Sequence, residues 1–142
     1  MPEFTIHLTD WAHEQARLSQ LRRTVFIDEQ GVPEALEWDA DDAGSLHFLV
    51  VDRSGQAIAC ARLLPDGHLG RMAVLPAWRG HGVGRALLAA AQNAAQACGR
   101  ARVRLSAQTH AADFYVRAGF VAVGEEYEEA GIPHVAMQKN LT

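Results

Sequence analysis

The stretch RMAVLPAWRGHGVGRALLAAAQ, residues 71–92, places three glycines at alternate positions between an apolar strand and an alanine-rich helix. Glycines let backbone N–H groups adopt positive φ and approach a ligand closely. The first N–H groups of a helix have no partner within the helix and carry partial positive charge, so an anion can bind there. We therefore expect Gly80, Gly82 and Gly84 to form an anion-binding loop at the start of a helix from about Gly82 to Ala97.

Charges are segregated around this loop. Residues 67–112 contain no Asp or Glu, but they contain Arg71, Arg79, Arg85, Arg100, Arg102 and Arg104. The acidic residues are concentrated in residues 28–42 and 125–129. Because such segregation creates a local field, we expect the central segment to receive a phosphate and the acidic flanks to favour a cation.

Two common phosphate-binding motifs do not fit the loop. A P-loop needs Lys and then Ser or Thr after its last glycine, where this chain has Arg85 and Ala86. A dinucleotide fingerprint needs glycine at position 85 and an acidic residue at the end of the next strand, which here ends in Ser-Ala-Gln, residues 106–108.

The remaining patterns predict one mixed α/β domain over residues 1–142. Period-two alternation and turn residues predict strands at residues 4–8, 46–52, 56–64, 68–74, 101–106, 120–127 and 133–139. Helices are expected at residues 11–30, 82–97 and 111–118, with an acidic loop at 31–44. The order predicts a mixed, mostly antiparallel sheet with one βαβ crossover at the glycine loop, flanked by helices.

Residues 79–84, RGHGVG, resemble the R/Q-x-x-G-x-G/A signature of the GCN5-related N-acetyltransferase (GNAT) superfamily. HAADFYVRAGF, residues 110–120, resembles that family's A-x-x-FYxxxGF segment, and the element order is that of the GNAT fold, so the resemblance covers almost the whole chain. RRTVFIDEQGVPEALEWDADD, residues 22–42, looks like the R-x-x-V-F-x-x-E-Q segment of uncharacterised bacterial GNAT proteins.

The resemblance implies the acyl-CoA N-acyltransferase fold and acetyl-CoA as the acetyl donor. It implies that the pyrophosphate lies on the N–H groups of residues 80–85 and that the pantetheine arm pairs along the strand before the loop, which splays from the strand after the helix. A backbone N–H near Val74 would polarise the thioester carbonyl. The cofactor-binding residues implied are Met72, Ala73, Val74, Arg79, Gly80, His81, Gly82, Val83, Gly84, Arg85 and Gln108.

Tyr115 is the candidate catalytic residue, because a phenol can protonate the departing CoA thiolate and the family's FY tyrosine has this role. Phe114 and Ala118 form an apolar i, i+4 pair, so we expect Phe114 to be the core member. Gln108 stands where many family members have Asn, and it could contact the pantetheine or Tyr115.

The acceptor is expected to be a primary amine of a small molecule or peptide, which must lose a proton before it attacks. The sequence does not select the base among Glu29, Glu37, Glu125, Glu126 and His134. Candidate acceptor-site residues are Glu29, Glu37, Asp39, Asp42, Arg71 and His134. No histidines have metal-ligand spacing, so no metal is expected.

Two other functions stay open from the sequence. One is a non-catalytic acyl-CoA-binding or regulatory module. The other is an enzyme like the acyl-homoserine lactone synthases, whose Arg, Phe and acidic pattern is similar to Arg22, Phe26, Glu37, Asp39 and Asp42 but which use S-adenosylmethionine.

The expected setting is the cytoplasm. The chain has two scattered cysteines, no signal-peptide pattern and no apolar run of membrane-spanning length. With a net charge of −4 and no stacking platform, neither a nucleic-acid nor a membrane partner is expected. The oligomeric state is open, a homodimer included.

Overall fold

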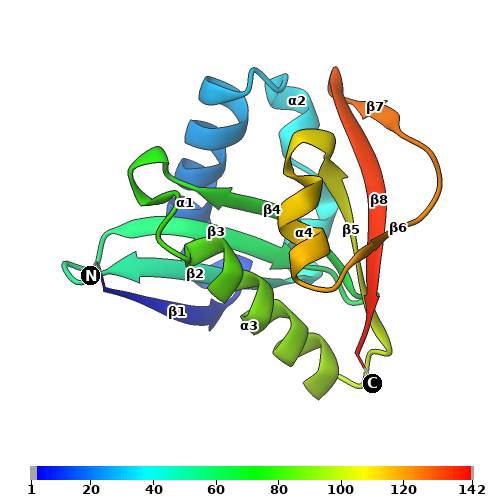
Figure 1. Ribbon diagram of the computed structural model, residues 1–142. Helices are drawn as coiled ribbons and strands as arrows, with labels where there is room; N and C mark the ends of the chain where they lie inside the picture. Colours follow the sequence, from blue (N-terminus) through cyan, green and yellow to red (C-terminus); the bar gives the residue numbers. More distant parts are fainter. Residues whose placement is uncertain (1–2, 142) are drawn as a thin grey trace.

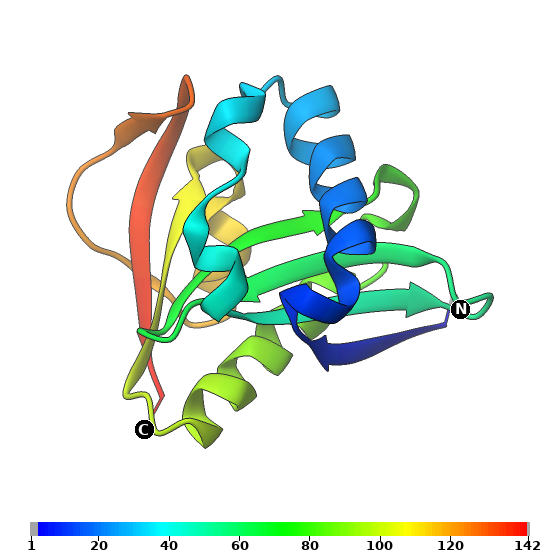
Figure 2. The same cartoon turned by 180° about the vertical axis from the view of Figure 1, so that it is seen from behind.

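A twisted β-sheet runs through the molecule, with helices on both of its faces (Figures 1 and 2). The computed structural model describes residues 3–141. Its strands are β1 (Phe4–Thr9), β2 (Leu46–Asp52), β3 (Ala57–Leu63), β4 (His68–Val74), β5 (Arg102–Gln108), β6 (Val121–Ala122), β7 (Tyr127–Glu129) and β8 (Ile132–Asn140). Its α-helices are α1 (Trp11–Arg22), α2 (Glu34–Glu37), α3 (Val83–Ala97) and α4 (Ala112–Arg117). A π-helical segment, η1 (Arg23–Glu29), follows α1, and short 3-10 turns are η2 (Ala40–Gly44), η3 (Pro76–Trp78) and η4 (Thr109–Ala111).

The strands lie in the order β1-β2-β3-β4-β5-β8-β6, with β7 also paired to β8. Strands β4 and β5 are parallel, whereas the other neighbours are antiparallel. A parallel pair needs a crossover connection, and α3 supplies it. The predicted mixed, mostly antiparallel sheet with a central βαβ crossover is therefore confirmed.

Strands β4 and β5 separate after two paired positions. His68 lies opposite Arg104 and Leu69 lies opposite Leu105, and the described residues show no further pair between these strands. Strand β5 instead follows β8 along its whole length. The two strands diverge and leave a gap in the sheet, as the resemblance implied (Figure 1).

The sheet separates two apolar layers. Phe48 and Val50 of β2 pack in one cluster with Leu87 of α3, whereas Leu49 packs in another with Leu18 of α1. We call the side covered by α3 and α4 the α3 face (Figure 1) and the side covered by α1 and α2 the α1 face (Figure 2). The alternation of side chains along a strand places neighbouring residues in different layers.

A β-bulge in β4 decides which of its side chains reach which face. The pairing of β4 with β3 shifts by one residue at Arg71 and Met72. Arg71 has a φ of 49°, a left-handed conformation that costs a non-glycine residue about 1–2 kcal/mol. The extra residue leaves Arg71 on the α1 face, where it donates to the Glu37 carbonyl, while Met72 and Val74 pack on the α3 face.

The helix predicted over residues 11–30 is confirmed as far as residue 29, but it is α-helical only to residue 22. The Asp10 carboxylate caps α1 by accepting from the His13 N–H at 2.9 Å. After Arg22 the chain continues as η1, where wider turns replace the α-helical ones and the Gln30 N–H donates to the Val25 carbonyl five residues earlier. Residues 31–44, expected as loop, contain α2 and η2.

The strand predicted at residues 120–127 is also wrong, because it is two short strands. Strand β6 pairs with β8 at Gln138 and Met137, and β7 pairs with it from His134 to Ile132. Between them the chain leaves β8 in a loop that turns at Gly124, which has a φ of +87°. Such a turn suits glycine, which has no Cβ to clash.

Candidate functional site

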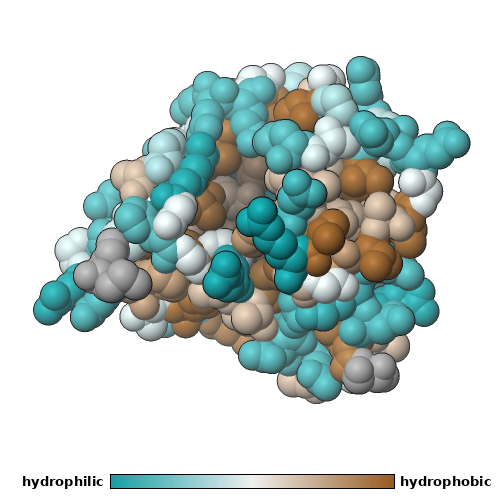
Figure 3. Space-filling view, in the orientation of Figure 1, coloured by the Kyte–Doolittle hydropathy of each residue, from teal (hydrophilic) through white to brown (hydrophobic). Residues whose placement is uncertain are grey.

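The gap between β4 and β5 belongs to a cavity of about 810 Å³, a volume within the usual range for small-molecule sites. Residues of both faces line it, such as Phe26 and Gln30 from the α1 face and Gly84 and Tyr115 from the α3 face. The cavity therefore passes through the sheet where the strands diverge. The surface of the α3 face shows a recess with apolar lining near its centre (Figure 3).

The cavity brings together many of the residues predicted from the sequence. Those that line it are Met72, Val74, Arg79, Gly84, Gln108, Tyr115, Glu29, Glu37, Arg71 and His134. The predicted residues outside its lining are Ala73, Gly80, His81, Gly82, Val83, Arg85, Asp39 and Asp42. The first four of these belong to β4 and the loop that leads into α3, and Val83 and Arg85 belong to the first turn of α3.

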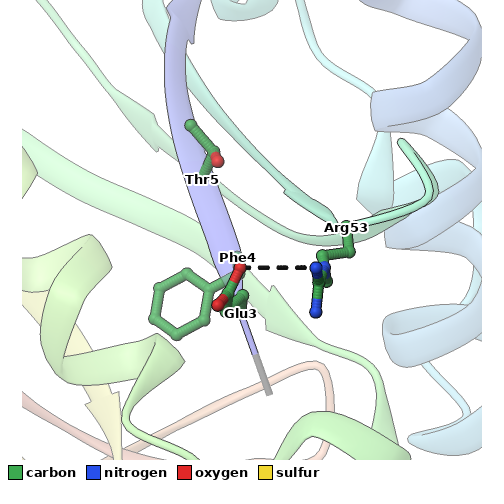
Figure 4. Close-up of a pocket in the computed structure, with 4 residues that line it drawn as sticks. All are labelled: Glu3, Phe4, Thr5 and Arg53. Carbon is green, nitrogen blue, oxygen red and sulfur yellow. Dashed lines mark ion pairs between the residues drawn. The ribbon is translucent and has the colours of Figure 1, made fainter. Parts of the chain in front are cut away.

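A smaller cavity of about 380 Å³ lies at the start of β1, away from these residues (Figure 4). Glu3, Phe4, Thr5 and Arg53 line it, and the Glu3 carboxylate lies 3.8 Å from the Arg53 guanidinium. Both charged side chains are largely exposed, so this ion pair is weak. The larger cavity is the candidate site.

The glycine loop leaves the first N–H groups of α3 free of helix partners. Gly80 and Gly82 have φ of +80° and +84°, and no side chain caps the helix at Gly82. The first helical bond runs from the Ala86 N–H to the Gly82 carbonyl, so the N–H groups of residues 83–85 precede it. A Cβ on Gly80 or Gly82 would meet no atom within 4 Å, which leaves open space in front of the loop.

Gly84 has a different reason to be glycine. An added Cβ would lie 3.3 Å from Cζ of Phe114, so this position lets α4 approach α3 closely. Val83 is buried in the core and can offer only its backbone to a ligand at the loop. His81 is exposed beside Trp78, and Arg85 is exposed.

Arg79 joins the glycine loop to η1. Its Nη1 and Nη2 lie 2.6 and 2.7 Å from the two carboxylate oxygens of Glu29, and its Nε donates to the Val74 carbonyl. This bidentate hydrogen bond lowers the pKa of Glu29 below its ordinary value. The sequence analysis predicted that Arg79 binds the cofactor and that Glu29 lies in the acceptor site. In the structure the two side chains form an ion pair with each other.

The edge of β4 that faces the gap has a free backbone N–H. The Leu75 N–H donates to the Ile58 carbonyl of β3 at 3.0 Å. In an antiparallel ladder, alternate residues point their N–H groups to opposite sides. The Val74 N–H is therefore directed away from β3, toward the side where β5 has separated. This position agrees with the predicted site for an added extended chain.

The expectation that Phe114 is the core residue of the FY pair is wrong. Phe114 is 37% exposed, whereas Tyr115 is partly buried and packs against the core, with its ring 6.0 Å from that of Phe120. Burial raises the pKa of the Tyr115 phenol above its ordinary value, so it stays protonated at neutral pH. Tyr115 lines the cavity on the α3 face.

Gln108 and His134 lie on the opposite face. The Gln108 amide donates to Oε1 of Gln30 in η1 at 2.9 Å, so in this structure it reaches across the cavity and not toward Tyr115. His134 lies opposite Gln108 in the β5–β8 pair, and opposite residues share a face. The cavity also includes His68 and Ser106, which the sequence analysis did not single out.

The acidic cluster expected to attract a cation is neutralised by the chain's own arginines. Arg22 is 1% exposed and donates to Glu37 at 2.8 Å and to Asp42 at 2.7 Å. Arg62 and Arg71 pair with Asp39. Glu37 and Asp42 are 3% exposed, so the expectation of solvated acids available to a cation is wrong for them.

Arg22 is also held between two aromatic rings. Its guanidinium carbon lies 5.3 Å from the centre of the Trp11 ring and 5.2 Å from that of Trp38, within cation–π range. The only local signal for this network is the arginine that begins the RRTVF segment. The partners on β3 and β4 are distant in sequence and carry no local signal.

Glu125 and Glu126, the other candidate bases, lie in the exposed loop between β6 and β7 and do not line the cavity. Within residues 3–141, no three His, Cys, Asp or Glu side chains are arranged to hold a metal ion. No helix in the same range has the length and apolar character to cross a membrane.

Known proteins share this sequence and fold. A family model described as acetyltransferase (GNAT) domain matches residues 8–141. The uncharacterized N-acetyltransferase YjcF of Bacillus subtilis is 37% identical over 123 residues, which cover 84% of this chain and 88% of that protein. Protein ElaA of Escherichia coli is 34% identical over 135 residues, covering 87% and 86%.

The structural match extends over nearly the whole chain. The crystal structure of an acyl-CoA N-acyltransferase from Pseudomonas aeruginosa matches with a TM-score of 0.83 and 36% identity, covering 98% of this chain and 99% of that one. The family model covers residues 8–141, and the relatives named above are more than 30% identical over most of both chains. The chain belongs to the GNAT acetyltransferase family.

Proposed function

We propose that this protein is an acetyl-CoA-dependent N-acetyltransferase that acts on a primary amine of a small molecule or peptide. One observation carries the proposal: the uncapped, glycine-formed start of α3 adjoins a cavity that contains the free edge of β4. An anion-binding backbone next to an open strand edge suits a long ligand with a phosphate group and an amide-bearing arm. Membership of the GNAT family supports the same assignment.

The backbone of the glycine loop and of β4 supports acetyl-CoA as the ligand. The N–H groups of Val83, Gly84 and Arg85 are available for the pyrophosphate, and open space lies in front of Gly80 and Gly82. Acetyl-CoA would supply an acetyl thioester with an electrophilic carbonyl. The backbone of β4 from Met72 to Val74 would hold the pantetheine arm, with the free Val74 N–H as hydrogen-bond donor.

Tyr115 is the proposed general acid. It lines the cavity on the α3 face, which is also the face of the glycine loop. Burial raises the pKa of its phenol, so the hydroxyl is protonated at neutral pH and has a proton to give to the departing thiolate. The ring packing against Phe120 holds the side chain in place.

Calorimetric titration with acetyl-CoA tests the cofactor. Gly82→Glu adds a negative charge and a Cβ at φ +84°, and it should abolish binding. Gly55→Glu is the matched control. Gly55 has φ +88° and equally open surroundings, but it lies in the turn between β2 and β3 and not in the glycine loop. Equal binding by both variants would contradict the proposed phosphate site.

The same titration discriminates the alternatives. Binding of S-adenosylmethionine in place of acetyl-CoA would favour a lactone-synthase-like enzyme. Tight acetyl-CoA binding without CoA release in the presence of any amine of a broad panel would favour a binding module. Release of CoA with an amine establishes the transferase.

A further inference from the structure

Transfer to an amine requires a group that takes up the amine's proton, and we propose that His134 is this general base, with Glu129 stabilising its protonated form. The inference rests on the proposed acetyltransferase activity. It assigns the acceptor to the α1 face of the cavity, opposite Tyr115. The proton passes from the acceptor nitrogen to Nε2 of His134 as the nitrogen forms its bond to the acetyl carbon, and Tyr115 gives a separate proton to the departing sulfur.

The strand register places His134 beside the part of β4 that is proposed to hold the pantetheine arm. The last β4–β5 pair is Leu69 with Leu105. The bulge makes Arg71 and Met72 share one position of β4, so three positions further along the two strands lie Ala73 and Gln108. Gln108 lies opposite His134 on β8. His134 is therefore level with the stretch of β4 proposed to hold the pantetheine arm, but on the other face of the sheet from the Met72 side chain.

The contacts of His134 define which nitrogen is the base. Its Nδ1 lies 2.6 Å from the carbonyl oxygen of Ile132, and because a carbonyl only accepts hydrogen bonds, Nδ1 must carry the hydrogen. The neutral ring then has its lone pair on Nε2. This nitrogen lies 3.9 Å from a carboxylate oxygen of Glu129, close enough to stabilise an imidazolium.

The ring of His134 is also held rigidly. It is 7% exposed and stacks on Tyr127, with ring centres 6.0 Å apart and planes 24° from parallel. The Tyr127 hydroxyl forms a short hydrogen bond with the Ser106 hydroxyl on β5, which fixes the stacking partner in turn. A base that is already oriented loses little entropy when the amine arrives.

The carboxylates that compete for this role are occupied. Glu29 is bound by both terminal nitrogens of Arg79, and the Glu37 carboxylate lies within 2.8 Å of Arg22 and 3.1 Å of Arg71. The hydrogen bonds from Arg79 lower the pKa of Glu29, which makes it a weak proton acceptor. Burial raises the pKa of Glu37, but two guanidinium groups already contact its carboxylate, which leaves an amine little access to it.

His68 is the remaining rival, because it lines the same cavity. Burial lowers the pKa of His68 below the ordinary value of an imidazole, which makes it a poor proton acceptor. Other ionisable groups line this cavity or contact His134 and contribute to its pH dependence. They are Glu129 and Tyr127 on β7, His68 and Arg71 on β4, Glu29 on η1, Glu37 on α2, Arg79, His110 on η4 and Tyr115 on α4. The neighbouring β5 residues on the face, Ser106 and Gln108, are neutral.

Three variants test the proposal by the pH dependence of kcat/KM for the amine. His134→Gln should lower kcat/KM by about 10²- to 10⁴-fold and remove its acidic limb, while the Kd for acetyl-CoA changes less than about twofold. Glu129→Gln alters a side chain that is 59% exposed, so the variant should fold like wild type. It should lower kcat/KM by roughly two- to fivefold. His68→Gln should keep the acidic limb. Persistence of that limb in His134→Gln, or its loss in His68→Gln, overturns the proposal.

Nitrogen-15 NMR of the ligand-free protein tests the same base without turnover. The ring signals of His134, identified by their loss in His134→Gln, should show a hydrogen on Nδ1 and none on Nε2 in the neutral form. A neutral ring with its hydrogen on Nε2 would overturn the inference, regardless of the kinetic results. Wild type that fails to bind acetyl-CoA refutes the proposed function and the base with it, whereas wild-type turnover with an unaffected His134→Gln refutes the base alone.

Discussion

Replacing Arg22 should destabilise this protein far more than replacing Arg23, the next residue along the chain. The Arg22 side chain is 1% exposed and bonds two carboxylates that are each 4% exposed, those of Glu37 and Asp42. Arg23 is 42% exposed and pairs with Glu34, which is 57% exposed. The two substitutions are chemically identical, so their difference isolates the effect of burial.

The magnitude follows from what Arg22→Met leaves behind. Methionine keeps an unbranched apolar stem between Trp11 and Trp38, so packing is largely conserved. The carboxylates of Glu37 and Asp42 lose a buried partner, and breaking a buried ion pair in this way costs about 3–5 kcal/mol. Domains have only about 5–15 kcal/mol of stability, so the variant should fold marginally. Arg23→Met should be indistinguishable from wild type.

Urea unfolding followed by tryptophan fluorescence measures the difference. With a slope of about 2 kcal/mol/M, Arg22→Met should lower the midpoint by roughly 1.5–2.5 M. The triple variant Arg22→Met/Glu37→Gln/Asp42→Asn should recover part of the lost stability. Its two amide side chains are neutral, so neither position 37 nor position 42 then holds a charge that lacks Arg22. Recovery should be incomplete, since Arg62 and Arg71 also lose partners. If Arg22→Met and Arg23→Met unfold at the same midpoint, the buried network does not stabilise the fold and the reasoning fails.

Three further predictions concern single side chains. Tyr115→Phe should lower kcat by about 10²- to 10⁴-fold with acetyl-CoA affinity nearly intact, and an unchanged kcat in a steady-state assay would remove Tyr115 from the mechanism. Glu29→Gln should destabilise by at most about 1 kcal/mol at pH 7, since the pair with Arg79 is partly exposed. Arg79 lowers the Glu29 pKa from 4.5, so this contribution is present above that value and is lost as the pH falls through the lower folded pKa, and unfolding at pH 7 and pH 3 checks the loss. Gly84→Ala should leave stability within about 1 kcal/mol, because Phe114 is 37% exposed and can move to admit the methyl while alanine favours the helix, and a thermal melt measures it.

The glycine loop and the crossover could be predicted because their signals are local. Glycines between a strand and a helix predict a turn and an uncapped helix N-terminus, and Gly80 and Gly82 do have the positive φ of such a turn. The assignment of Phe114 and Tyr115 failed for the opposite reason. An i, i+4 pair shows which residues share one side of α4, but not which side faces the sheet, and Phe114 instead covers Gly84 at the surface.

The acidic segment shows the same limit for charge. Counting charges along the chain placed Glu37, Asp39 and Asp42 on an anionic flank. The arginines that neutralise them come partly from β3 and β4, and Arg71 reaches them only because the bulge in β4 shifts its side chain. Local composition predicts neither the bulge nor which strands are neighbours. The electrostatic field at the site therefore depends on tertiary contacts.

The residues around the cavity favour direct transfer over an acyl-enzyme. Burial raises the pKa of the Cys60 thiol to about 12, and Cys98 is exposed, so within residues 3–141 neither thiol lines the cavity as a ready nucleophile. Donor and acceptor must then be present together, which a cavity that crosses the sheet allows. The proposed acid, Tyr115, and the proposed base, His134, lie on opposite faces of that sheet. Tyr115 can therefore donate a proton to the departing sulfur while His134 accepts a different proton from the attacking nitrogen, with no exchange between the two residues.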